Sequence, residues 1–189
     1  NRIVGAVVLI SRDGKLVYQR AAGLADREAK RPMELNTIFR LSSVTKPIAS
    51  AAALALVDRG KLSLNDPVTR YLPSFRPRLA DGKTPEITVR QLLTHTSGLG
   101  YKFTEKAGSP YHAAAISDGF DEVRIDLPEN LRRLSSAPLF SAPGEAFRYS
   151  LSIDVLGDVI EKARGKRLQA AVAELVTDPL GMKDTSFLA

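Results

Sequence analysis

Two strand-like runs separated by a tight turn constrain the fold of this chain more than any other feature. Residues 3–10 form a continuous apolar run rich in β-branched side chains, and residues 16–18 form a second run after Arg12-Asp13-Gly14. Two runs joined through Asp-Gly predict a β-hairpin. The continuous apolar first strand indicates a sheet covered on both faces. Because two strands are too few for a stable sheet, we expect further strands from elsewhere.

The segment at residues 48–57 predicts the central helix. It is rich in alanine, the best helix former, and Gly60 stands where a residue after the helix end is expected. The segment has no polar face, so we expect this helix to be buried on all sides. Ser43 then lies at its N-terminal end. Further helices are predicted after Asn65, after Thr88, from Pro128 to Leu134, over 155–163 and over 168–176, with a long loop over 100–127.

Composition excludes several classes of function. The 189 residues contain no cysteine, so thiolate metal sites and a cysteine nucleophile are ruled out, and the two histidines, His95 and His112, cannot build a zinc site alone. The net charge of +6 comes from scattered basic pairs among acids, which does not suit a nucleic-acid binder. No apolar run reaches the length of a membrane span. We therefore expect neither nucleic acid nor membrane as a partner.

Ser43-Val44-Thr45-Lys46 forms a Ser-x-x-Lys sequence at the start of the central helix. Residues three apart share a helix face, so the amine can reach the hydroxyl. A buried lysine favours its neutral form and can then act as a base. The alternative is a serine N-cap followed by a lysine that points to water. Chance alone gives about one Ser-x-x-Lys among 15 Ser and 10 Lys, so the motif depends on its context.

Two tyrosines and a histidine are further candidates. Tyr149 precedes the helix at 155–163, and a phenol beside an ammonium can relay a proton to and from a serine. Taken alone, Tyr149 and Tyr101 each favour a place at the rim of the core. His95 lies within Thr-His-Thr-Ser-Gly and is expected to hydrogen-bond its own turn rather than to catalyse.

Three motifs occur together and in a fixed order: Phe-Arg-Leu-Ser-Ser-Val-Thr-Lys-Pro at 39–47, Leu-Leu-Thr-His-Thr-Ser-Gly-Leu at 92–99 and Tyr-Ser-Leu at 149–151. This combination resembles the serine β-lactamase and DD-peptidase superfamily, and within it the family VIII carboxylesterase branch. The likeness extends over essentially the whole chain. It implies an α/β fold of the α+β type, in which an antiparallel sheet is flanked by helices and accompanied by a helical subdomain.

The resemblance also assigns roles to single residues. It implies that Ser43 is acylated, that Lys46 is its first activating partner and that Tyr149 relays protons in acylation and deacylation. The Ser43 N–H would form half of the oxyanion hole, and Tyr101 matches a tyrosine that lines the acyl pocket. No cofactor or metal is implied.

The sequence departs from this family in two ways. Class C β-lactamases carry Tyr-x-Asn, whose asparagine helps to bind the substrate amide, whereas the matching residue here is Leu151, assigned to substrate binding but unable to donate a hydrogen bond. Relatives are also nearly twice as long and carry a third motif on a C-terminal strand. We therefore expect residues 1–189 to be the N-terminal part of one catalytic domain, comprising 1–60 (first strands and nucleophile helix), 61–165 (helices and loops) and 166–189 (return toward the sheet).

The expected function is hydrolysis of short-chain acyl esters through an acyl-enzyme on Ser43. The alternatives are a class C-like β-lactamase or DD-peptidase, and a catalytically silent ligand-binding relative, which an intact set of Ser43, Lys46 and Tyr149 disfavours. A remaining segment or chain would complete the sheet and the oxyanion hole. The expected location is the cytoplasm, or the periplasm if a leader has been removed.

Overall fold

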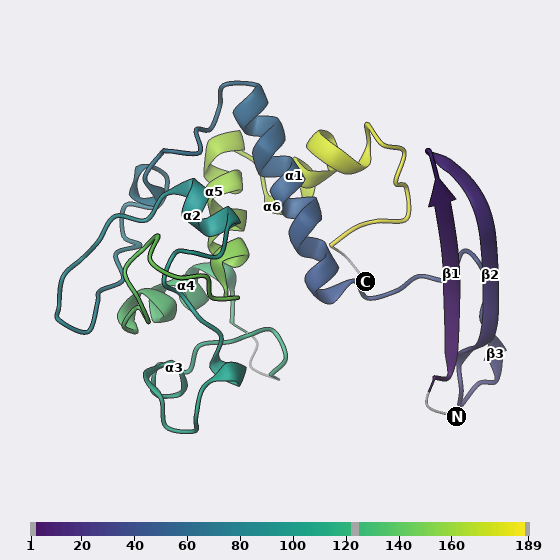
Figure 1. Ribbon diagram of the computed structural model, residues 1–189, viewed down its shortest axis with the longest axis horizontal. Helices are drawn as coiled ribbons and strands as arrows, with labels where there is room; N and C mark the ends of the chain where they lie inside the picture. Colours follow the sequence, from purple (N-terminus) through teal and green to yellow (C-terminus); the bar gives the residue numbers. More distant parts are fainter. Residues whose placement is uncertain (1–2, 122–124, 188–189) are drawn as a thin grey trace. The chain divides into compact units, whose positions relative to one another are not determined.

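The computed structural model describes residues 3–121 and 125–187, and these divide into two compact units, one ending at Ser42 and the next beginning at Ser43 (Figure 1). The first unit contains β1 (Gly5–Arg12), β2 (Lys15–Asp26) and β3 (Arg31–Pro32). The second contains α1 (Thr45–Asp58), α2 (Val89–Leu93), α3 (Pro110–Ala113), α4 (Leu127–Ser136), α5 (Ser152–Arg164) and α6 (Leu168–Val172). Short 3-10 turns lie at Ser42–Val44, Val68–Arg70 and Lys102–Thr104, and a π-helical turn at Ala173–Thr177 follows α6.

The predicted hairpin is confirmed in the first unit. Strands β1 and β2 pair antiparallel from Gly5 opposite Gly23 to Arg12 opposite Lys15, and β3 adds a short third strand beside β2. Asp13 and Gly14 both have positive φ, at 51° and 72°, as the mirror-image hairpin turn requires.

Within the first unit the strands by themselves cover neither face of the sheet, so the expectation of a sheet covered on both faces stays a prediction. Val8, Leu9 and Ile10 are 46%, 61% and 49% exposed, and the apolar residues of β2 from Leu16 to Tyr18 are exposed as well. A continuous apolar run shows what a strand is suited to bury, but burial also requires neighbouring layers, which the three strands of the first unit do not supply by themselves.

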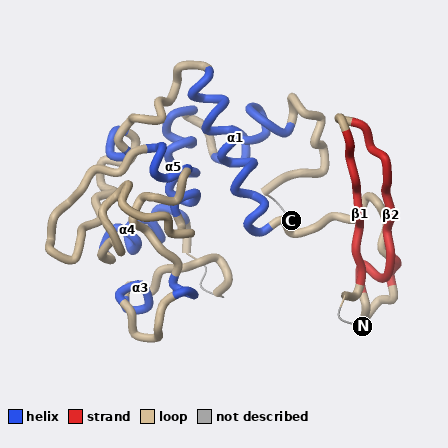
Figure 2. Tube along the Cα trace, in the orientation of Figure 1, coloured by secondary structure: helices blue, strands red, loops and turns tan. Residues whose placement is uncertain are grey.

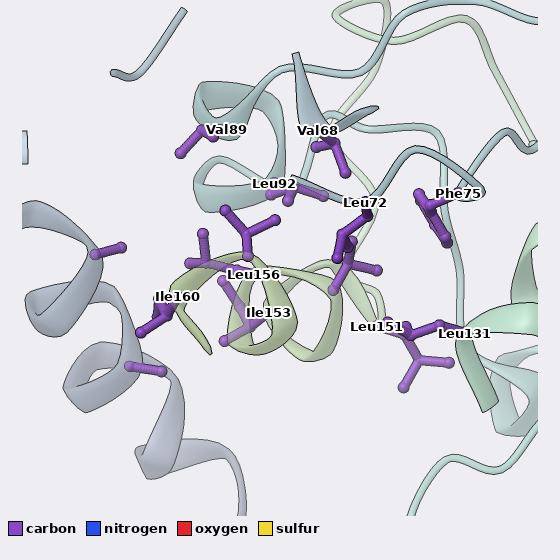
Figure 3. Packing of buried hydrophobic residues seen from close by; sticks show 14 of the residues in the cluster. Val68, Leu72, Phe75, Val89, Leu92, Leu131, Leu151, Ile153, Leu156 and Ile160 are labelled. Carbon is purple, nitrogen blue, oxygen red and sulfur yellow. The ribbon is translucent and has the colours of Figure 1, made fainter. Parts of the chain in front are cut away.

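Helix α5 lies at the centre of the second unit, where α1, α2, α4 and α6 pack against it (Figures 1 and 3). Leu156 and Ile160 of α5 are fully buried, and Val89 and Leu92 of α2 cover them from one side. Loops make up much of the chain segment that runs from the end of α1 to the start of α5 (Figure 2). The helical core therefore fixes the segments that enter and leave α1, α2 and α5.

Local signals in the sequence correctly predicted several helix ends. Thr88 and Gln91 form a reciprocal cap at the start of α2: the Gln91 N–H donates to the Thr88 hydroxyl at 3.3 Å, and the Thr88 N–H donates to the Gln91 side chain at 2.8 Å. Gly165 ends α5 in the left-handed conformation, with φ of 69°. The loop predicted over 100–127 also holds the short helix α3.

The second unit by itself covers only one face of α1, so the prediction that the central helix is buried on all sides is not met within this unit. Ala49, Ala52 and Leu56 of α1 are buried on the side that packs against α5, α6 and the π-helical turn, whereas Leu54 is 49% exposed and Ala51 is exposed. An all-apolar circumference allows burial on every side, but these packing partners contact only one face of α1.

Gly98 provides a stability test within the second unit. Its φ is +83°, and a Cβ atom built there would collide with the backbone carbonyl of Ser141. Gly82 has nearly the same φ, +85°, but open space around the Cβ position. We expect Gly82→Ala to lower the free energy of unfolding by about 1 kcal/mol and Gly98→Ala by about 3 kcal/mol, since only the second adds a clash to the backbone strain. Thermal or urea unfolding of the two variants measures the difference; equal losses would contradict it.

Within residues 3–121 and 125–187, no helix has both the length and the apolar character needed to cross a membrane. The division of residues 1–189 into three parts of one catalytic domain remains a prediction.

Candidate active site

The side chains of Ser43, Lys46 and Tyr149 meet at the N-terminal end of α1. Ser43 lies in the 3-10 turn that leads into this helix, and Lys46 lies in its first turn, so both project from the same end. The Tyr149 hydroxyl hydrogen-bonds to Ser43 Oγ at 2.7 Å, and Lys46 Nζ donates to the same oxygen at 3.4 Å. Ser43 is exposed and Tyr149 is 39% exposed, so solvent and small molecules can reach the three groups.

Tyr149 reaches Ser43 because the segment before α5 is bound to the loop after α2. The Arg148 N–H donates to the carbonyl of His95 at 2.8 Å, and the Leu151 N–H donates to that of Gly100 at 3.2 Å. These two bonds hold the backbone on either side of Tyr149. The loop after α2 therefore positions a phenol that lies more than a hundred residues from the serine.

Tyr101 forms a second aromatic wall beside Lys46. Its ring lies 5.4 Å from that of Tyr149, and Lys46 Nζ lies 5.5 Å from the Tyr101 ring and 4.8 Å from the Tyr149 ring. Asp118 supports this position by accepting from the Lys102 and Phe103 N–H groups, at 2.9 and 2.8 Å. Tyr101 is only 4% exposed. Its place in the acyl pocket remains a prediction.

The pKa of Lys46 is raised, which favours the ammonium and runs against the expectation that burial would make this residue a neutral base. Burial lowers its pKa, but interactions with the side chains of Tyr101 and Tyr149 outweigh this effect and raise the pKa above its ordinary value. An ammonium between two phenols stabilises phenolate rather than accepting a proton. The spacing of Ser43 and Lys46 predicted their contact, but it gave no indication that Tyr101 and Tyr149 would lie beside Lys46.

The two tyrosines beside this ammonium have pKa values shifted in opposite directions. Burial acts to raise the pKa of Tyr149, but Lys46 and the Ser43 hydroxyl favour the phenolate, and the net pKa is lowered. Tyr101 is more deeply buried, and burial raises its pKa despite Lys46. Opposite shifts of neighbouring groups separate their chemical roles. Tyr149 is therefore the better proton acceptor for Ser43.

Leu151 lies away from this group of side chains. Its side chain is 1% exposed and packs in the helical core, where Figure 3 shows it near Leu131. The expectation that Leu151 binds substrate is corrected by this placement: just before α5, the residue points into the apolar core, and its isobutyl group has no free surface for a ligand.

The sequence predicted that the imidazole of His95 hydrogen-bonds its own turn, but its partner in the structure is Ser150. Its Nδ1 accepts from the Ser150 N–H at 3.3 Å and lies 3.2 Å from the Ser150 hydroxyl. Its ring lies 5.0 Å from that of Tyr149. His95 therefore lies beside Tyr149. The two residues are more than fifty positions apart, so the motif around His95 gave no sign of this contact.

The sequence profile described as Beta-lactamase matches residues 1–189, the whole of this chain. The chain belongs to the beta-lactamase family. A relative from Burkholderia gladioli named Esterase EstB is 60% identical over 188 residues, which cover 100% of this chain and 48% of that protein.

Two solved structures have a fold similar to that of this chain. EstCE1, described as a hydrolase with promiscuous acyltransferase activity, matches with a TM-score of 0.93 and 49% identity over 95% of this chain and 47% of the other. An octameric penicillin-binding protein homologue from Pyrococcus abyssi matches with a TM-score of 0.76 and 28% identity over 96% of this chain and 40% of the other. The chain spans about half the length of the relatives it matches.

Sequence reasoning missed Asp154, a buried carboxyl in the first turn of α5. Burial raises the pKa of Asp154 to about 6, although the nearby charge of Lys46 acts to lower it. At neutral pH a pKa of about 6 favours the carboxylate form of Asp154, whose charge interacts with that of Lys46. The only available signal was its place five residues after Tyr149. Among the residues that the structure describes, no three His, Cys, Asp or Glu side chains gather as metal ligands would.

Proposed function

We propose that the whole protein to which this chain belongs is a serine carboxylesterase that hydrolyses short-chain acyl esters. The observation that carries the proposal is the position of Ser43 Oγ, within hydrogen-bonding reach of both the Tyr149 hydroxyl and Lys46 Nζ. A nucleophile needs an adjacent base, and that base needs a group that orients and charges it. The names of Esterase EstB and EstCE1 support the same reaction class.

In the proposed mechanism, Tyr149 as phenolate takes the proton of Ser43 while Oγ attacks the ester carbonyl. The tetrahedral intermediate collapses, the C–O bond to the alcohol breaks, and Tyr149 returns the proton to the leaving oxygen. Water then attacks the acyl-enzyme while Tyr149 takes a proton from it; the C–O bond to Ser43 breaks, Tyr149 returns that proton to Ser43 Oγ, and the acid leaves. Lys46 keeps its proton throughout and stabilises the phenolate.

Two parts of the proposal concern chain outside these residues. The Ser43 N–H would donate one hydrogen bond to the developing oxyanion, and a second donor would come from the remaining segment or chain. The exposed apolar side chains of β1 and β2, together with the half-length match to relatives, support further strands in the same sheet. The ester substrate would be a small molecule. We also propose that the protein is located in the cytoplasm, or in the periplasm if a leader is removed.

A class C-like β-lactamase or DD-peptidase is the second candidate, supported by the match to a penicillin-binding protein homologue. The two candidates differ in what they bind beside the reactive carbonyl. Because Esterase EstB is 60% identical to this chain and the penicillin-binding protein homologue only 28%, we place the esterase first.

The test compares two substrate classes with the whole protein. We expect fast hydrolysis of p-nitrophenyl acetate and butyrate, and slow or absent hydrolysis of a chromogenic cephalosporin. The kcat/KM values of the two reactions measure the preference. A higher kcat/KM for the cephalosporin would favour the second candidate, and no reaction with either would favour a silent relative.

The charge of Lys46 gives a pH-dependent prediction. Because the ammonium lowers the pKa of Tyr149, Lys46→Met should raise that pKa, move the acid limb of the kcat/KM profile to higher pH and cut kcat/KM at pH 7.5 by about a hundredfold. Activity should partly return as the pH approaches the ordinary pKa of tyrosine. Profiles above pH 7 keep Asp154, with a pKa of about 6, ionised.

Lys46→Arg is the matched control, since it keeps the positive charge. Its acid limb should stay near that of the native protein, even if kcat falls through altered geometry. An unchanged limb in Lys46→Met would show that the ammonium does not set the ionisation of Tyr149.

A further inference from the structure

His95 is bonded to the chain on both sides of Tyr149. Its backbone carbonyl accepts from the Arg148 N–H at 2.8 Å, and its imidazole Nδ1 accepts from the Ser150 N–H at 3.3 Å. Its ring also lies 5.0 Å from the ring of Tyr149, the residue between Arg148 and Ser150 in the chain. One residue thus restrains the backbone before and after Tyr149, and the orientation of its ring as well.

A buried row of hydroxyls anchors this arrangement. The Ser150 hydroxyl lies 3.2 Å from His95 Nδ1 and 2.7 Å from the Ser152 hydroxyl, which lies 2.7 Å from that of Ser97. All three serines are 0% exposed. Ser97 belongs to the loop that carries His95, and Ser152 begins α5. The row therefore links the loop to Ser152 of α5 by two routes, directly from Ser97 and from His95 through Ser150. A buried polar row of this kind is rigid only when each member has a hydrogen-bond partner.

The bonds of His95 require the neutral imidazole. Nδ1 accepts a hydrogen bond from the Ser150 N–H, so the ring proton of the neutral form resides on Nε2. Burial lowers the pKa of His95, and the charge of Lys46 lowers it further. Lys46 and Tyr149 are the titratable groups that face the ring among the described contacts. At neutral pH the acceptor is therefore available.

The backbone of His95 is in a conformation that few residues adopt. Its φ is +53°, in the left-handed region, where histidine, asparagine and aspartate are the commoner non-glycine residues. The conformation turns the chain at the end of α2 and brings both the carbonyl and the ring toward residues 148–150. Such strain persists where surrounding contacts maintain it, often beside functional groups.

We propose that His95 is a positioning residue that holds the Tyr149 hydroxyl against Ser43, a role that rests on the proposed function. The imidazole acts through Tyr149 and does not replace it as base, because Nδ1 is already bound to Ser150. Removing the acceptor frees the Ser150 end of the restraint. The phenol then spends less time near Ser43 and Lys46, the two groups that stabilise its anion.

Two substitutions separate the acceptor from the ring. His95→Phe keeps an aromatic ring beside Tyr149 but removes Nδ1. His95→Asn places an amide oxygen near the position of Nδ1, and asparagine tolerates the left-handed backbone. We expect His95→Phe to lower kcat for p-nitrophenyl butyrate by about ten- to a hundredfold with KM little changed, and His95→Asn to restore most of the loss. His112→Phe, which removes a bond to Ser109 outside the site, is the control for histidine replacement.

Two readouts distinguish positioning from a general loss of folded protein. Rates are expressed per active serine, counted by titration with a fluorophosphonate, so that unfolded molecules do not contribute. The pKa of Tyr149 is measured from phenolate absorbance at alkaline pH, as the difference between each variant with and without Tyr149→Phe. We expect this pKa to rise in His95→Phe and to stay near the native value in His95→Asn and His112→Phe.

An unchanged Tyr149 pKa in His95→Phe, or a kcat loss fully accounted for by fewer active serines, would overturn the positioning role. The absorbance titration needs no turnover, so it decides the role of His95 even if the native protein hydrolyses no ester. Absence of fluorophosphonate labelling in the native protein would instead contradict the proposed function.

Discussion

Ser43→Ala should lower kcat/KM for p-nitrophenyl butyrate by about 10⁴- to 10⁶-fold in the whole protein, the size of effect found when a serine nucleophile is removed. The change deletes the oxygen atom to which Tyr149 and Lys46 both hydrogen-bond and leaves the ammonium and phenol in place. Ser43 is exposed and its hydroxyl closes no helix cap, so the free energy of unfolding should change little. Steady-state kinetics and urea unfolding measure the two quantities.

Ser136→Ala is the matched control for this substitution. Ser136 is also exposed, and its hydroxyl donates only to the carbonyl of Arg133 at the end of α4. Its kcat/KM should equal that of the native protein. If Ser43→Ala retained activity within tenfold of the native protein, another nucleophile would carry the reaction and the proposed mechanism would fail.

Tyr149→Phe has the second largest expected effect, a loss of about 10³- to 10⁴-fold in kcat. The ring contacts with His95 and Tyr101 remain, while the atom that bonds to Ser43 Oγ is removed. Because Tyr149 acts in both acylation and deacylation, both steps slow down. Pre-steady-state release of p-nitrophenol measures the first step, and turnover at saturation measures the slower of the two.

Tyr71→Phe is the control for loss of a phenol. The Tyr71 hydroxyl donates to Asp66 at 2.6 Å, outside the candidate site. This substitution should lower the free energy of unfolding by about 1–3 kcal/mol and leave kcat unchanged. A similar loss of kcat in both tyrosine variants would mean that Tyr149 matters for folding rather than for proton transfer.

Most local structure of this chain was predictable because its signals lie within a few residues of one another. Asp13-Gly14 specifies the hairpin turn, Thr88 and Gln91 specify a helix start, and Gly165 specifies a helix end. Each depends on one backbone conformation or one short-range bond. The Ser43–Lys46 pair is local in the same sense, since a single turn of α1 brings the two side chains together.

Features that depend on distant partners were predicted less well. The apolar surface of α1 gave no indication that only one face is covered. The raised pKa of Lys46 depends on Tyr101 and Tyr149, and the raised pKa of Asp154 depends on its burial. The core position of Leu151 depends on where α5 begins. In each case, tertiary contacts decide what the residue type alone leaves open.

Trapping the acyl-enzyme tests the central claim most directly. The whole protein is mixed with p-nitrophenyl butyrate, quenched in acid within the first turnover and digested with trypsin, which releases residues 41–59 as one peptide because Pro47 protects the bond after Lys46. We predict one butyryl group on this peptide, located on Ser43 by fragmentation and absent from Ser43→Ala. A butyryl group on Ser42, Ser50 or any other peptide in place of Ser43 would contradict the account.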